Sequence, residues 1–128
     1  MAKVSHFMTE ICVEDVQTWH TTPFLSIDID WAHDAVLQYT IDILSKYALP
    51  VTWFATHETE LLKQISDNPN FEIGIHPNFN NLISSDEKSL SPRKIMDDMC
   101  SFVPNAKIIR SHSLTQNSYL LDLFASYN

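Results

Sequence analysis

The stretch "FLSIDIDWAHD" at residues 24–34 combines strand-forming residues with two carboxylates. Asp28 and Asp30 are two positions apart, and side chains two positions apart on a β-strand lie on the same face. We therefore expect both aspartates to point the same way near the end of a strand over residues 23–30. Two like charges in a mostly apolar setting repel each other and lose hydration, so this pair requires counter-charge.

The chain continues outward from this stretch as an alternation of strand-like and helix-like segments. Strand character recurs over residues 23–30, 50–57, 71–77 and 105–111. Helical spacing follows each of them, over residues 33–48, 58–68, 92–103 and 115–128. The polar residues 78–91 indicate a long loop, and Ser91 is suited to cap the helix that begins at Pro92. Four such units in series predict an α/β fold of parallel βα repeats, a partial (β/α) barrel.

Composition and charge narrow the class of protein further. The 128 residues are enough for one domain, which we place over residues 23–128 after a lead-in segment over residues 1–22. A net charge of −8 argues against nucleic acid or an anionic membrane surface as partner. No apolar run is long enough for a membrane span and no secretory signal is evident, so we expect a cytoplasmic protein. Gly74 is the only glycine, where average usage predicts about nine.

Polar and titratable side chains follow the predicted strands at the point where each strand ends. Because the carboxyl ends of parallel strands meet at one edge of a sheet, we expect these side chains to lie close together. They are Asp28, Asp30, Thr56, His57, His76, Arg110 and His112. The counter-charge for the aspartates comes either from Arg110 or from a divalent metal held by Asp30 and neutral imidazoles. Carboxylate and imidazole ligands suit zinc, so the pattern favours metal-assisted hydrolysis over a purely structural polar cluster.

At these residues the sequence resembles the polysaccharide deacetylases of the NodB-homology type, carbohydrate esterase family 4, and above all the branch found in bacterial surface-polysaccharide gene clusters. "SIDIDWA" resembles the first family motif, which implies that Asp28 is the general base and Asp30 a metal ligand. "FEIGIHPNFN" resembles the second motif and implies that His76 is a ligand, whereas the second histidine of that motif falls on Asn80. "AKIIRSHSL" resembles the third motif, whose arginine pairs with the base, here Arg110.

The departure at Asn80 leaves the third metal ligand open. His112 lies two residues after Arg110, on the same face of the predicted strand, and we favour it as the replacement imidazole. His57 is a further candidate for the metal or the substrate. Asn80 can ligate through its amide oxygen but is a poor zinc ligand beside histidine. His57 and His112 are also the candidates for the acid that protonates the leaving amine, when they do not ligate.

The resemblance further implies a barrel of about seven strands, of which this chain supplies four βα units. We therefore expect it to correspond to the N-terminal part of such a domain, incomplete at the C-terminus, and either marginally stable or covered by formation of a homo-oligomer. The implied function is a metal-dependent, most simply zinc-dependent, hydrolase that removes N-acetyl groups from a polysaccharide or its precursor. The alternatives are a truncated non-catalytic module, and a metal-dependent hydrolase of another amide or ester.

Overall fold

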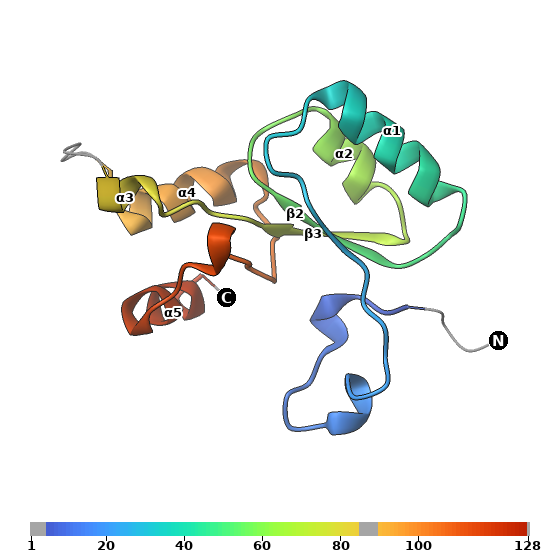
Figure 1. The fold of residues 1–128 in the computed structure, drawn as a ribbon, viewed down its shortest axis with the longest axis horizontal. Coiled ribbons are helices and arrows are strands. Elements are labelled where there is room, and N and C mark those ends of the chain that lie inside the picture. Colours follow the sequence, from blue (N-terminus) through green and yellow to red (C-terminus); the bar gives the residue numbers. More distant parts are fainter. Residues whose placement is uncertain (1–4, 85–89, 128) are drawn as a thin grey trace.

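The computed structural model describes residues 5–84 and 90–127, and its centre is a parallel three-stranded sheet (Figure 1). The strands are β1 (Ser26–Asp28), β2 (Val51–Ala55) and β3 (Phe71–Ile75), in the order β1-β2-β3. Strand β2 is rich in β-branched and aromatic residues and is buried along its whole length, as expected of a central strand covered on both faces. The parallel α/β fold predicted from the sequence is confirmed.

Helices connect the strands and continue beyond them. They are α1 (Asp34–Ser45), α2 (Leu61–Ser66), α3 (Asn81–Ser84), α4 (Pro92–Phe102) and α5 (Ser118–Ala125). The short 3₁₀ helices are η1 (Met8–Glu10), η2 (Val16–Thr18) and η3 (His112–Leu114). The side chain of Ser91 caps α4 as predicted, accepting a hydrogen bond from the Lys94 N–H at 3.1 Å. The predicted loop over residues 78–91 contains α3, and its residues 85–89 lie outside the described residues.

The hydrophobic core lies between the sheet and the helices. Helices α1 and α2 lie together over one face of the sheet (Figure 1). Leu37 and Ile41 of α1 are four positions apart, so both point to the same side of the helix, and they share one buried cluster with Trp53 of β2. Helices α4 and α5 are joined by a hydrogen bond of 2.5 Å, which the hydroxyl of Tyr127, just after α5, donates to the Asp97 carboxylate of α4.

The lead-in segment contacts the opposite face of the sheet. The backbone N–H of Met8 donates to the Thr52 hydroxyl of β2 at 3.1 Å, and the N–H of Thr9 donates to the Glu72 carboxylate of β3 at 3.3 Å. Since Thr52 and Glu72 are register partners, both side chains project from this second face. Residues 5–10 therefore cover a polar face that α1 and α2 do not reach. Among the residues that the structure describes, no helix combines the length and apolarity needed to cross a membrane.

The predicted fourth strand over residues 105–111 is wrong as a full strand, because the described segment forms only one β-bridge, between Ile109 and Ile75. The flanking hydrogen bonds are those of a parallel ladder: Ile75 N–H to Ile108 C=O, Arg110 N–H to Ile75 C=O, and His112 N–H to Pro77 C=O, at 2.8–3.1 Å. The next bond of that ladder would run from the N–H of residue 77 to the Arg110 carbonyl. Proline has no N–H, so the ladder is interrupted there.

The single glycine lies where the fourth segment crosses β3. A Cβ added to Gly74 would lie 2.6 Å from the carbonyl oxygen and 2.6 Å from the Cγ2 of Ile108, and 3.0 Å from the Phe54 ring. The φ angle of Gly74 is not positive, so the requirement here is close approach and not backbone freedom. A side chain at this position would push away the segment that carries Arg110 and His112.

We expect Gly74→Ala to lower the free energy of unfolding by about 2–3 kcal/mol, because the added methyl group meets a backbone atom that cannot rotate aside. Urea denaturation followed by circular dichroism measures the change. Ala48→Gly is the reciprocal control: Ala48 has a φ of 49°, and glycine there should stabilise by about 0.5–1 kcal/mol. A Gly74→Ala protein as stable as the wild type would contradict the role assigned to this close approach.

Candidate metal centre

Asp28 and Asp30 are oriented toward the same site by different backbone structures, a strand end and a left-handed turn. Strand β1 ends at Asp28, and Asp30 lies beyond it with a φ of 47°, followed by Trp31 with a φ of 56°. The expectation that strand alternation alone aligns the two carboxylates is therefore wrong. A left-handed turn directs Asp30 instead, at a cost of about 1–2 kcal/mol per non-glycine residue. The Thr56 hydroxyl stabilises this turn by accepting the Trp31 N–H at 2.9 Å.

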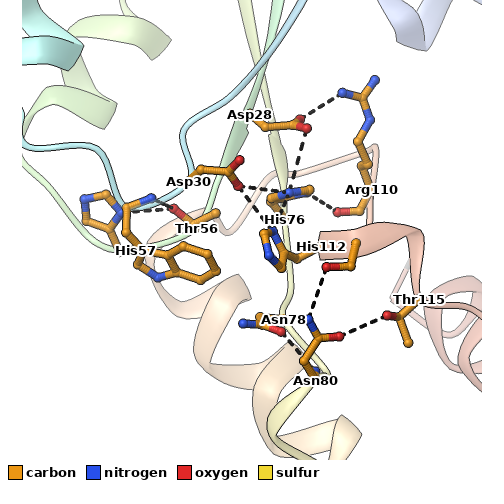
Figure 2. A network of polar contacts seen from close by, with 12 residues as sticks. Asp28, Asp30, Thr56, His57, His76, Asn78, Asn80, Arg110, His112 and Thr115 are labelled. Carbon is orange, nitrogen blue, oxygen red and sulfur yellow. Dashed lines mark hydrogen bonds and ion pairs between the residues drawn. The ribbon is translucent and has the colours of Figure 1, made fainter.

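Arg110 supplies counter-charge to the first aspartate. Its Nη1 lies 2.8 Å from Asp28 Oδ1, and its Nη2 donates to the Ser26 hydroxyl at 3.1 Å. The guanidinium group lies 4.2 Å from the centre of the Phe54 ring, which supports it from one side. These contacts leave Asp28 Oδ2 on the opposite side of the carboxylate, 3.8 Å from His76 Nε2. One carboxylate oxygen is thus held by the Arg110 guanidinium while the other faces the His76 imidazole (Figure 2).

Three potential ligand atoms converge beside this ion pair. Asp30 Oδ1 lies 3.4 Å from His76 Nε2 and 3.3 Å from His112 Nδ1, and the two imidazole nitrogens are 3.3 Å apart (Figure 2). The three atoms therefore form a nearly equilateral triangle. His76 is only 3% exposed, whereas the Asp30 side chain is 53% exposed, so the triangle has a buried corner and an open one. His112, two residues after Arg110, is the first residue of η3, so it reaches the triangle from a 3₁₀ turn and not from the predicted strand.

The triangle is a candidate metal-binding site. Its three ligand atoms come from one carboxylate and two imidazoles and all lie within 4.8 Å of one another. Carboxylate oxygens and imidazole nitrogens are ligands of zinc and of similar first-row divalent ions.

The backbone carbonyl of Arg110 fixes the tautomer of His76. His76 Nδ1 lies 2.5 Å from this oxygen, and because a carbonyl can only accept, Nδ1 must carry the proton. In the neutral ring Nε2 is then unprotonated and presents its lone pair to Asp30 and His112, as a ligand nitrogen must. The Arg110 carbonyl is available because Pro77 cannot donate to it. The interruption of the fourth strand and the orientation of His76 thus have the same cause.

His57 and Asn80, the other two predicted site residues, bond to the loops around the triangle. His57 Nδ1 lies 3.0 Å from the Thr56 hydroxyl, the group that also accepts the Trp31 N–H. Asn80 donates to the Ser113 hydroxyl at 3.1 Å and accepts from Thr115 at 3.2 Å, so it holds the turn that follows His112 (Figure 2). Their assignment as alternative ligands or substrate contacts stays a prediction.

Reasoning from the sequence missed several residues at this site, among them Ser26, Pro77 and Trp31. Ser26 is two positions before Asp28 on the same strand face, so the alternation used for the aspartates could have identified it. Pro77 follows His76 directly, and a proline at the end of a predicted inner strand is itself a signal of an interrupted ladder. Trp31 carried no such signal, because its placement depends on the left-handed turn at Asp30.

The fold and this strand-end edge define an α/β protein with a carboxylate–imidazole cluster at the ends of parallel strands. A family model described as "WbmS-like: Polysaccharide deacetylase" matches residues 25–128. The chain therefore belongs to the WbmS-like family of polysaccharide deacetylases. A search of curated proteins gave no match.

A solved structure agrees with this assignment. The chain is 39% identical to a Bordetella bronchiseptica protein, WbmS, whose crystal structure is described as that of a polysaccharide deacetylase involved in O-antigen biosynthesis. The two superpose with a TM-score of 0.91 over 97% of this chain and 51% of that one. This chain thus spans about half the length of the Bordetella protein.

We expect Pro77→Ala to redistribute the tautomers of His76, because the restored N–H competes with Nδ1 for the Arg110 carbonyl. Long-range ¹H–¹⁵N spectra of the imidazole in metal-free protein should show the Nδ1–H form in the wild type and a mixture in the variant. Stability should change by less than about 1 kcal/mol, since the added ladder bond offsets the greater freedom of the unfolded chain. Pro69→Ala, at an exposed position before β3, is the matched control. A variant with Nδ1–H alone would overturn this account.

Proposed function

We propose that this chain is a zinc-dependent hydrolase that removes N-acetyl groups from a sugar of a surface polysaccharide or its precursor. The main support for this proposal is the triangle formed by the ligand atoms of Asp30, His76 and His112, 3.3–3.4 Å apart, beside the Asp28–Arg110 ion pair. Membership of the polysaccharide deacetylase family supports a saccharide substrate, and the likeness to a protein described as acting in O-antigen biosynthesis supports surface polysaccharide.

Asp30, His76 and His112 would hold the zinc ion. When bound, zinc acts as a Lewis acid toward a carbonyl oxygen and lowers the pKa of a coordinated water from far above the physiological range to about 7. Removal of an N-acetyl group requires these properties, because the acetamide carbonyl is a poor electrophile and neutral water a poor nucleophile. The exposed position of Asp30 leaves this side of the site open to a chain substrate.

Asp28 is proposed to take the proton from the attacking water. Its Oδ1 accepts a hydrogen bond from Arg110, whereas its Oδ2 faces the triangle at His76 and can accept a proton there. Arg110 holds the carboxylate in this orientation, and Ser26 and Phe54 hold Arg110 in turn. With His112 on the metal, His57 is the remaining candidate from the sequence for the acid that protonates the leaving amine.

Zinc binding tests the ligand set directly. We expect the wild-type protein to bind one zinc ion per chain, and Asp30→Ala and His112→Ala each to weaken binding at least about 100-fold. Calorimetric titration and elemental analysis measure this, and the intensity of cobalt(II) absorption reports tetrahedral geometry. The control is His20→Ala, which removes an exposed histidine of the lead-in segment. Equal zinc affinity in wild type and Asp30→Ala would rule out the proposed centre.

Acetate release tests the reaction. On N-acetylated oligosaccharides the zinc-loaded protein should release acetate, and Asp28→Asn should lower the rate at least about 100-fold with zinc affinity unchanged, as expected for loss of a general base. Asp122→Asn, at an exposed position of α5, is the control. A zinc-loaded wild type that releases no acetate would favour the non-catalytic module. Turnover of p-nitrophenyl acetate alone would favour hydrolysis of another ester or amide.

A further inference from the structure

Trp31 presents an indole ring beside the ligand triangle. It follows Asp30 directly and remains 47% exposed, and its ring centre lies 5.0 Å from that of His112 in an edge-on arrangement of 75°. His112 contacts His76 in the same way, at 5.2 Å and 83°. The indole therefore lies against the partly exposed imidazole of the triangle, His112, which is itself 3.3 Å from the Asp30 carboxylate.

The backbone keeps Trp31 in this place at a cost. Its φ of 56° is a left-handed conformation that a bulky residue seldom adopts and that glycine adopts freely. The Thr56 hydroxyl accepts the Trp31 N–H, and Ala32 N–H donates to the Ile29 carbonyl at 3.0 Å, so the turn is held on both sides of the tryptophan. A large apolar side chain in a strained and anchored turn next to a polar site indicates a functional contact.

We propose that Trp31 is a binding platform for a sugar ring, and therefore a specificity-determining residue for saccharides over acyclic amides. This rests on the proposed function. The electron-rich face of an indole attracts the polarised C–H groups on one face of a pyranose, and it excludes water from that face. Because the ring is in contact with a proposed metal ligand, a sugar stacked on it has its N-acetyl substituent within reach of the triangle.

A second role for Trp31 must be separated from this one, because the indole also supports the edge of the His112 ring. If support were its whole contribution, its removal would weaken zinc binding and leave sugar binding at saturating zinc unchanged. If it is a platform, its removal weakens sugar binding and leaves zinc affinity unchanged. Trp19 offers a matched control, since it is 41% exposed and its ring contacts His20 in the lead-in segment.

The experiment uses triacetylchitotriose, N-acetylglucosamine and N-acetylgalactosamine as probes of the zinc-loaded protein. The three tryptophans give three indole N–H signals, and we expect titration to shift that of Trp31 while those of Trp19 and the buried Trp53 stay in place. Trp31→Ala should weaken sugar binding about tenfold, Trp31→Phe much less, and Trp19→Ala not at all. Calorimetry of zinc alone should give the same affinity for Trp31→Ala and wild type.

Hydrolysis separates this inference from the proposed function. Trp31→Ala should lose about tenfold in kcat/KM on the N-acetylated sugars and nothing on N-acetylethanolamine, which has the amide but no ring. A Trp31 signal that none of the three sugars moves, or a Trp31→Ala protein that binds sugar as the wild type does, would overturn the platform even if acetate is released. Sugar binding that depends on Trp31 in a protein without acetate release would uphold the platform and reject the hydrolase.

Discussion

The geometry of the candidate site depends on one hydrogen bond, from His76 Nδ1 to the carbonyl of Arg110 at 2.5 Å. In a regular parallel ladder this carbonyl would accept the N–H of residue 77, but Pro77 has none to donate. The same carbonyl therefore serves an imidazole that is 97% buried and could not obtain this bond from solvent. The interruption of the ladder at Pro77 thus leaves the Arg110 carbonyl free to accept the Nδ1 proton of His76, and Nε2 is then the nitrogen that can bind a metal.

Backbone conformation at the site follows a second constraint, the use of a single glycine. Gly74 allows the close approach of the segment at Ile108 to β3, so the left-handed positions are occupied by other residues. Among the described residues these are Asp30, Trp31, Ala48, Ser113 and Leu114. Four of the five lie in the two turns that carry or directly follow the proposed ligands Asp30 and His112. The conformational strain of the described chain is therefore concentrated at the strand-end edge, where the contacts of Thr56 and Asn80 hold it.

The sequence predicted the parallel α/β fold and the convergence of the site residues, because both follow from local periodicity and from the rule that parallel strands end at one edge. Prediction from the sequence failed where the structure depends on a single backbone group or torsion angle. The strand over residues 105–111 has the right composition, yet Pro77 on the neighbouring strand removes the bond that would extend it. Asp30 was correctly expected near Asp28, but for the wrong reason, since a left-handed turn and not strand alternation orients its side chain. Such turns leave no periodic signal when the residues in them are not glycine.

Asp28 and Asp30 differ in charge environment, and this difference makes their proximity tolerable. Asp28 has its cation within the fold, because Arg110 is fixed by Ser26 and Phe54 whether or not a metal is present. Asp30 faces the imidazoles of His76 and His112 in the triangle, so the cation that would balance its charge is the proposed metal ion. Repulsion between the carboxylates is thus reduced at Asp28 by the protein and, on this proposal, at Asp30 by a metal ion. The two aspartates, the two imidazoles of the triangle and Arg110 all lie between residues 28 and 112 of this chain.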